Sequence, residues 1–146
     1  MWKAVFTALA LSLASIGPAS AQSSPFSGTW ASTSTPGRTW VVEHVASKIS
    51  QRVIFKEKEL RTNKWTIDGP AQTLPNAVGA TPAQTTASQD GQFLIFQGPI
   101  QLPGGPASFR QTWELGKASS LIVTTRVETA IGGTTFTNQE TFKKQQ

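Results

Sequence analysis

Alternation of apolar and polar residues runs along most of the chain and predicts β-strands. It is clearest in residues 49–57, where Val53 and Phe55 share one face. A repeat of two residues is typical of a strand that is buried on one side. Further strands are predicted at residues 28–33, 39–46, 60–68, 83–88, 92–97, 108–115, 119–129 and 134–143.

Turn-forming residues separate these strands. Pro36-Gly37, Asp90-Gly91 and Gly132-Gly133 combine residues that favour reversals of the chain. A hairpin tip is expected at residues 58–59, although no Asn-Gly pair marks it.

Two stretches rich in proline and glycine interrupt the alternation. Residues 69–82 are predicted to form a short irregular strand at 72–74 and then a loop over one mouth of a barrel. Residues 98–106 contain three prolines and three glycines. Because proline cannot donate to a β-ladder, this stretch is predicted to be a second long loop.

The number and spacing of these strands predict an all-β fold. About nine short strands with no helical periodicity indicate a small antiparallel up-and-down barrel or a curved half-barrel. A two-sheet sandwich is the alternative. Gly28 stands two residues before Trp30 in the first strand. We expect that glycine to allow close backbone approach and the indole to close one end of the sheet.

The first 21 residues have the features of a cleaved signal peptide, with a buried helix as the alternative. Lys3 precedes a mostly apolar run at residues 4–16, and Ala19 and Ala21 supply a small-x-small cleavage motif. The run is too short to span a bilayer. No cysteine follows it, so a lipid anchor is not expected. The prediction is a signal peptide at 1–21 and one domain at 22–146 of a periplasmic or secreted protein.

Composition narrows the set of partners. The formal charge of +5 falls by one when Lys3 is removed with the signal peptide. A mildly basic protein allows weak contact with anionic headgroups or glycans, and export argues against a nucleic-acid partner. The mature part has no second long apolar run, so it is not expected to span a membrane. With no cysteine, the fold must be stable without disulfides.

No catalytic or metal-binding pattern is visible. His44 is the only histidine, so nitrogen and sulfur ligands for zinc are lacking. Asp68 and Asp90 each precede glycine, which favours a turn role. Phosphate-binding glycine loops and Gly-x-Ser-x-Gly are also absent from the sequence. We therefore expect no enzyme, cofactor or metal; an acid–base site using carboxylates or His44 is the remaining alternative.

Aromatic residues on the predicted strands are the remaining candidates for a functional site. An antiparallel barrel of this size either fills its interior with side chains or leaves room for one small ligand. A binding site for a small apolar molecule is therefore one hypothesis, and a filled barrel that acts as a protein-interaction module of the cell envelope is the other. The candidate ligand-binding residues are Trp40, Phe55, Trp65, Phe93, Phe96, Phe109 and Trp113.

Several different short motifs follow one another along nearly all of the mature chain. They are residues 26–30 (Phe-Ser-Gly-Thr-Trp), 66–69 (Thr-Ile-Asp-Gly), 113–115 (Trp-Glu-Leu), 121–125 (Leu-Ile-Val-Thr-Thr) and 138–144 (Asn-Gln-Glu-Thr-Phe-Lys-Lys). With them the chain resembles small exported bacterial proteins with lipocalin-like, or calycin-like, barrels, mostly of unknown function. The resemblance implies that Trp30 packs at the closed end beneath an arginine of a late strand, for which Arg126 is the candidate.

Overall fold

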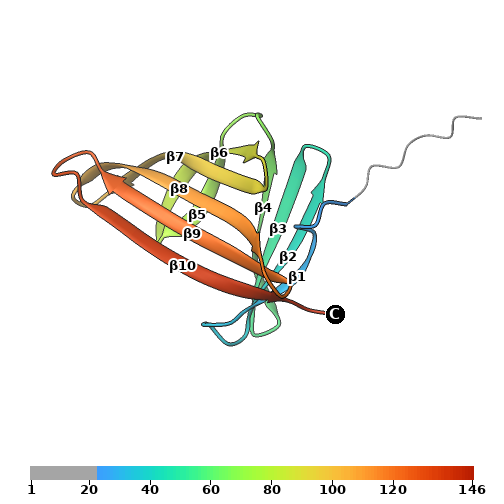
Figure 1. The fold of residues 1–146 in the computed structure, drawn as a ribbon. Coiled ribbons are helices and arrows are strands. Elements are labelled where there is room, and N and C mark those ends of the chain that lie inside the picture. Colours follow the sequence, from blue (N-terminus) through green and yellow to red (C-terminus); the bar gives the residue numbers. More distant parts are fainter. Residues whose placement is uncertain (1–22) are drawn as a thin grey trace, which may run out of the picture.

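The computed structural model describes residues 23–146, so the predicted signal peptide lies outside the described residues. Their regular structure consists of ten strands and no helix (Figure 1). The strands are β1 (Gly28–Ser32), β2 (Arg38–Val45), β3 (Lys48–Phe55), β4 (Lys58–Thr66), β5 (Gln72–Val78), β6 (Thr81–Asp90), β7 (Phe93–Leu102), β8 (Gly105–Gly116), β9 (Ser120–Thr129) and β10 (Thr135–Lys144).

One antiparallel sheet contains all ten strands and nearly closes on itself. The order is β4-β3-β2-β1-β10-β9-β8-β7-β6-β5, so almost every strand pairs with its neighbours in sequence. Pairing of β1 with β10 joins the two ends of the chain. The long strands β7–β10 cross the shorter strands β1–β4 at a steep angle (Figure 1). The all-β, antiparallel barrel prediction is thus confirmed, and the sandwich alternative is not.

Between β4 and β5 the ladder is interrupted, and we call this gap the seam. The segment after β4 crosses it, because the Asp68 amide donates to the Ala87 carbonyl at 2.8 Å and Ile67 forms a parallel bridge with Ala87. Trp65 Nε1 also donates to Thr85 Oγ1 at 3.0 Å. This side-chain hydrogen bond therefore helps to connect β4 with β6 across the seam, where no backbone ladder joins β4 to β5.

Aromatic side chains fill the middle of the barrel. The ring of Trp113 lies 5.3 Å from that of Trp40 and 4.5 Å from that of Phe96, measured between centroids. Trp40 stacks in turn on Phe142, and Trp65 on Phe96. Tilted rings at these distances gain stability beyond the area that they bury. The interior is therefore one continuous aromatic core.

At one end, which we call the floor, the barrel is closed by Trp30. Its side chain is 1% exposed, and its Nε1 donates to the Phe26 carbonyl at 2.9 Å. The cation over its ring is Lys144, whose Nζ lies 5.4 Å from the centroid. Arg126 is an exposed residue of β9 whose guanidinium bonds Glu128. Arg126 is thus not the partner of Trp30 that the resemblance implied.

The prediction of a long loop at residues 98–106 is wrong, because β7 continues to Leu102 and β8 begins at Gly105. Proline costs a ladder bond, but its fixed φ lies within the range that extended strands use. Gly98 is needed inside β7, since a Cβ there would lie 1.6 Å from the carbonyl oxygen of Gln84. The glycine thus permits close approach of β6 and does not mark a loop.

Two other predicted boundaries are also corrected. The turn between β3 and β4 is at Lys56 and Glu57, which have φ of 48° and 66°, and not at residues 58–59. Consecutive positive φ values are those of a tight hairpin turn, which here forms without glycine. In the other case, β5 extends over Gln72–Val78 with an irregular register, where only residues 72–74 were predicted.

Candidate functional site

The seven aromatic residues predicted to bind a ligand lie in three different environments. Five of them, Trp40, Trp65, Phe96, Phe109 and Trp113, are buried in the core. Phe93 is exposed on β7. Trp40 and Phe55 line a cavity at the end of the barrel opposite the floor. The structure therefore brings only these two together at an open cavity.

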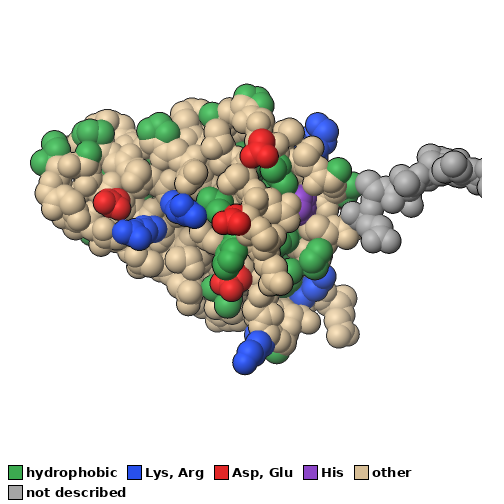
Figure 2. All heavy atoms as spheres, turned by 45° about the horizontal axis from the view of Figure 1, so that its top comes forward, with side chains coloured by type: hydrophobic (Ala, Val, Ile, Leu, Met, Phe, Trp, Pro, Cys, Tyr) green, Lys and Arg blue, Asp and Glu red, His purple; other side chains and the backbone are tan. Residues whose placement is uncertain are grey.

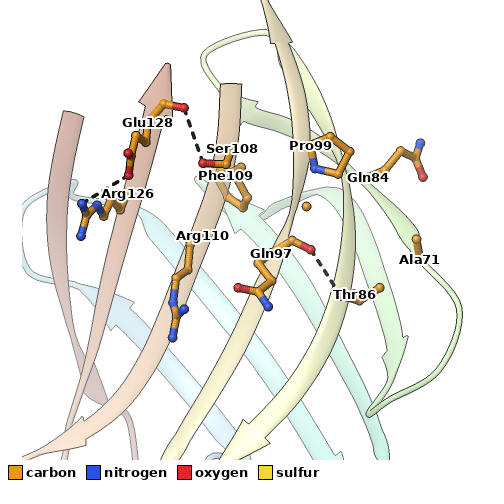
Figure 3. Close-up of a pocket in the computed structure, with 11 residues that line it drawn as sticks. Ala71, Gln84, Thr86, Gln97, Pro99, Ser108, Phe109, Arg110, Arg126 and Glu128 are labelled. Atoms are coloured by element: carbon orange, nitrogen blue, oxygen red, sulfur yellow. Dashed lines mark hydrogen bonds and ion pairs between the residues drawn. The ribbon is translucent and has the colours of Figure 1, made fainter. Parts of the chain in front are cut away.

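A large groove lies on the outside of β6–β9. It has a volume of about 740 Å³; most of its lining residues are polar or charged, although apolar atoms make up most of its surface. Figure 3 shows Arg126 turned toward Glu128, while Arg110 extends away from both. Ser108 and Thr86 bond only backbone carbonyls of the neighbouring strands. Because its polar groups do not converge on one point, this groove lacks the form of a binding site.

The cavity at the open end, which we call the mouth, is built from the inner face of the barrel. It has a volume of about 540 Å³, within the range of small-molecule sites. The turn residues Thr35 and Gly79 stand at its edge. Its inner lining comes from β2, β3, β4, β5, β8, β9 and β10, namely Arg38, Trp40, Val53, Phe55, Leu60, Arg61, Asn76, Ala77, Gln111, Thr125 and Glu140.

The apolar base of the mouth continues the aromatic core. Trp40 and Val53 face each other across β2 and β3, and both are buried. Trp40 contacts Trp113, which is fully buried beneath it. The same packed rings that fill the barrel thus leave one apolar surface at the bottom of the cavity.

Gln111 and Thr125 are polar residues of the mouth that are held in place by hydrogen bonds within the protein. Gln111 donates to Thr125 Oγ1 at 3.1 Å and accepts from Trp113 Nε1 at 2.9 Å. Its amide is therefore oriented by the core and by β9 together. A buried pair on β3 and β4 is similar, because Asn63 donates to Gln51 at 2.8 Å.

An ion pair crosses from β2 to β10 at the mouth. Nη1 of Arg38 lies 3.1 Å from both carboxylate oxygens of Glu140. Ser32 Oγ donates to the same carboxylate at 2.6 Å. Charge-assisted hydrogen bonds of this kind are short and strong. Glu140 therefore already accepts hydrogen bonds from donors of both β1 and β2.

Arg61 is the exception among the charged groups of the mouth. Its Nε is buried and has no hydrogen-bond partner within the described residues. Burial lowers the pKa of Arg61, and the positive charge of Arg38 acts in the same direction. The guanidinium remains charged, since arginine is not deprotonated in proteins. The mouth thus holds two cations and one carboxylate.

Sequence reasoning missed the charged residues of the mouth. Arg38 shares its strand face with Trp40, and Arg61 shares its face with Asn63 and Trp65. That parity was a usable signal, because residues two apart in a strand point to the same side. It was overlooked because charged residues near strand ends are usually solvated.

The His44 side chain belongs to the floor, away from the mouth. It is 3% exposed, and its Nδ1 lies 2.6 Å from Ser24 Oγ. Ser27 Oγ bonds both the amide and the carbonyl of His44, so two serines attach the N-terminal lead-in to β2. Burial lowers the pKa of His44, and a backbone bond to Ala46 opposes that shift. These contacts assign the imidazole a packing role in the floor.

Comparison with known proteins yields no relative: the chain matches no protein-family description and no curated protein.

Within residues 23–146, no three His, Cys, Asp or Glu side chains gather as a metal site would need. That part of the chain also has no helix long and apolar enough to cross a membrane. The geometry of the mouth is therefore the main guide to function.

Proposed function

We propose that this protein binds one small, largely apolar molecule in the mouth of its barrel. The observation that supports this is the cavity of about 540 Å³ that rests on Trp40 and Val53. Its base is apolar and its walls carry many polar groups, so it combines the apolar surface and the placed polar groups of a ligand site. The ordered amide of Gln111 and the Arg38–Glu140 pair are groups of that kind.

The proposal includes export and a lipocalin-like role. The small-x-small motif at Ala19-Ser20-Ala21 supports cleavage and release into the periplasm or the medium. An up-and-down barrel with one open end is a form that such binding proteins use. In this role the protein would sequester or carry its ligand without changing it.

Native mass spectrometry of the protein purified from a periplasmic extract tests this function. We expect a fraction of the protein to carry one additional small mass, released when the protein is denatured. Trp40→Ala should reduce that fraction, whereas Phe93→Ala, which changes an exposed aromatic residue, should not. A ligand-free mass in several independent preparations, combined with no binding of any apolar probe, would contradict the proposal.

An interaction module is the second candidate, and one surface favours it. At the tip formed by the β7–β8 and β9–β10 turns, Ile131 is 72% and Phe136 is 58% exposed. Leu102 and Pro103 lie beside them around a shallow depression. Figure 2 shows apolar side chains gathered at that end of the molecule. Exposed apolar groups that cluster often mark a site of association.

Cross-linking in intact cells distinguishes the two functions. A photoreactive residue at position 136 would trap a partner protein if the tip is the working surface. The same residue at position 93, on the outer face of β7, serves as the control. A specific adduct at 136 without any ligand in the mouth would favour the interaction module.

A further inference from the structure

The unpaired Arg61 indicates what chemistry the mouth selects. A buried guanidinium nitrogen without an acceptor loses its hydration and gains nothing in return. The other charged groups of the mouth are paired, because Arg38 and Glu140 form an ion pair and Ser32 donates to Glu140. Arg61 is therefore the donor whose partner the protein does not itself supply.

Charge balance shows which kind of partner fits. With Glu140 neutralised by Arg38, the charge of Arg61 is uncompensated within the mouth. Arg38 also repels it, which is part of the reason that the pKa of Arg61 is lowered. An anion bound beside the guanidinium of Arg61 would offset this excess positive charge. A carboxylate, sulfate or phosphate group matches the fork of a guanidinium best, because two of its oxygens can accept parallel hydrogen bonds.

The walls around Arg61 show what else the ligand must carry. Across the β3–β4 ladder Arg61 faces Val53, which in turn faces Trp40 of β2. Phe55 and Leu60 continue the apolar surface at the edge of the cavity. A free inorganic anion would leave this surface in contact with water, whereas an apolar chain or ring would cover it.

We propose that the mouth binds an amphipathic anion, with its carboxylate, sulfate or phosphate group on Arg61 and its apolar part on Trp40, Val53 and Phe55. This inference rests on the proposed function and names the class of its ligand. It also gives Arg61 the role of a specificity-determining residue. A neutral molecule of the same apolar shape would bind more weakly.

Calorimetric titration with three probes of one chain length tests the inference. The probes are decanoate, decanol and decyltrimethylammonium, below their micelle concentrations, with sodium acetate as the free anion. The signal-free protein should bind decanoate about tenfold more tightly than decanol, the scale expected for one charge-assisted hydrogen bond. Decyltrimethylammonium and acetate should bind more weakly than decanol.

The variant Arg61→Met removes the guanidinium and keeps an unbranched apolar side chain. It should lose the preference for decanoate while binding decanol as before. Arg52→Met is the matched control, since Arg52 lies on the outer face of β3 and pairs with Glu59 in solvent. Circular dichroism of each variant verifies that the barrel is intact.

The outcomes separate the two proposals. Equal binding of decanoate and decanol, unchanged in Arg61→Met, would overturn the anion inference and leave the binding function standing. Binding of acetate as tight as that of decanoate would show a simple anion site and overturn the amphipathic ligand. If none of the probes binds at all, the proposed function itself is contradicted.

Discussion

The two ends of the barrel differ in how they use their interior. At the floor, Trp30, Phe26 and Leu121 are buried within a continuous core, and the indole of Trp30 donates to the Phe26 carbonyl. At the mouth, the same inner faces carry Arg38, Arg61 and a cavity. Side chains that fill space stabilise a fold, whereas unfilled space and unpaired charge do not.

This difference indicates where stability and function are located. The floor has lost nearly all exposure to solvent, so its residues are expected to determine the free energy of unfolding. The mouth contains charged groups that lower the stability of the fold unless a ligand binds to them. Natural proteins commonly accept such local costs at functional sites. Substitutions at each end test whether the two ends are separable in this way.

The largest effect is expected from Trp30→Ala. Loss of this buried ring should lower the free energy of unfolding by about 3–5 kcal/mol, because a cavity replaces it. Urea titration followed by circular dichroism measures the change. Phe136→Ala removes an exposed aromatic residue and should cost far less. If the two variants were equally stable, Trp30 would not close the floor as described.

Much of the fold was predictable from the sequence because the strand pattern is strong. Period-two alternation located at least part of every long strand, and the turns predicted at Pro36-Gly37, Asp90-Gly91 and Gly132-Gly133 each join two strands. The prediction of a loop at residues 98–106 was wrong because Gly98 and Pro99 were interpreted by composition alone. Their place in β7 depends on contact with Gln84 of β6, which lies outside any local window.

The site was less predictable than the fold for a different reason. Alternation placed Trp40 and Trp65 on strands, but it did not show which of them would face inward or be covered. Coverage depends on how the strands curve together, since Trp65 is enclosed by Phe96 and Thr85 from distant strands. The ion pair of Arg38 with Glu140 also joins opposite ends of the chain. Neither contact leaves a signal in neighbouring residues.

Thr85→Val, a substitution at the seam, is expected to cause the next largest change in the free energy of unfolding. Valine has a similar shape but cannot accept the hydrogen bond from Trp65 Nε1. The buried indole donor would be left without a partner, so unfolding should become easier by about 1–3 kcal/mol. Thr86→Val, the adjacent exposed residue of β6, is the control. Equal stability of the two variants would mean that the side-chain bond does not hold the seam.

A smaller, pH-dependent effect is expected at the floor through His44. Because burial lowers its pKa below the usual 6.5, the folded state favours the neutral imidazole. Protonation would place a charge where Nε2 has no acceptor among the described residues. The contribution of His44 to the free energy of unfolding should therefore be complete above pH 6.5. It should be lost as the pH drops from there through the lowered folded-state pKa.

The control for this pH effect is His44→Phe, which cannot titrate. Its unfolding free energy, measured by urea titration between pH 7.5 and about pH 5, above most carboxylate titration, should vary less than that of the unchanged protein. The change should remain smaller than the loss from Thr85→Val. Identical pH profiles of the two proteins would exclude His44 as the titrating group.

At the mouth, Arg61→Met is expected to have the smallest effect on stability, and its sign is informative. Without ligand, the substitution removes a partly buried charge that has no partner and is repelled by Arg38. The free energy of unfolding should therefore stay the same or rise by up to about 1 kcal/mol. A loss as large as that of Thr85→Val would show that Arg61 supports the fold. Unchanged stability together with lost selectivity for decanoate would instead separate the binding end of the barrel from its floor.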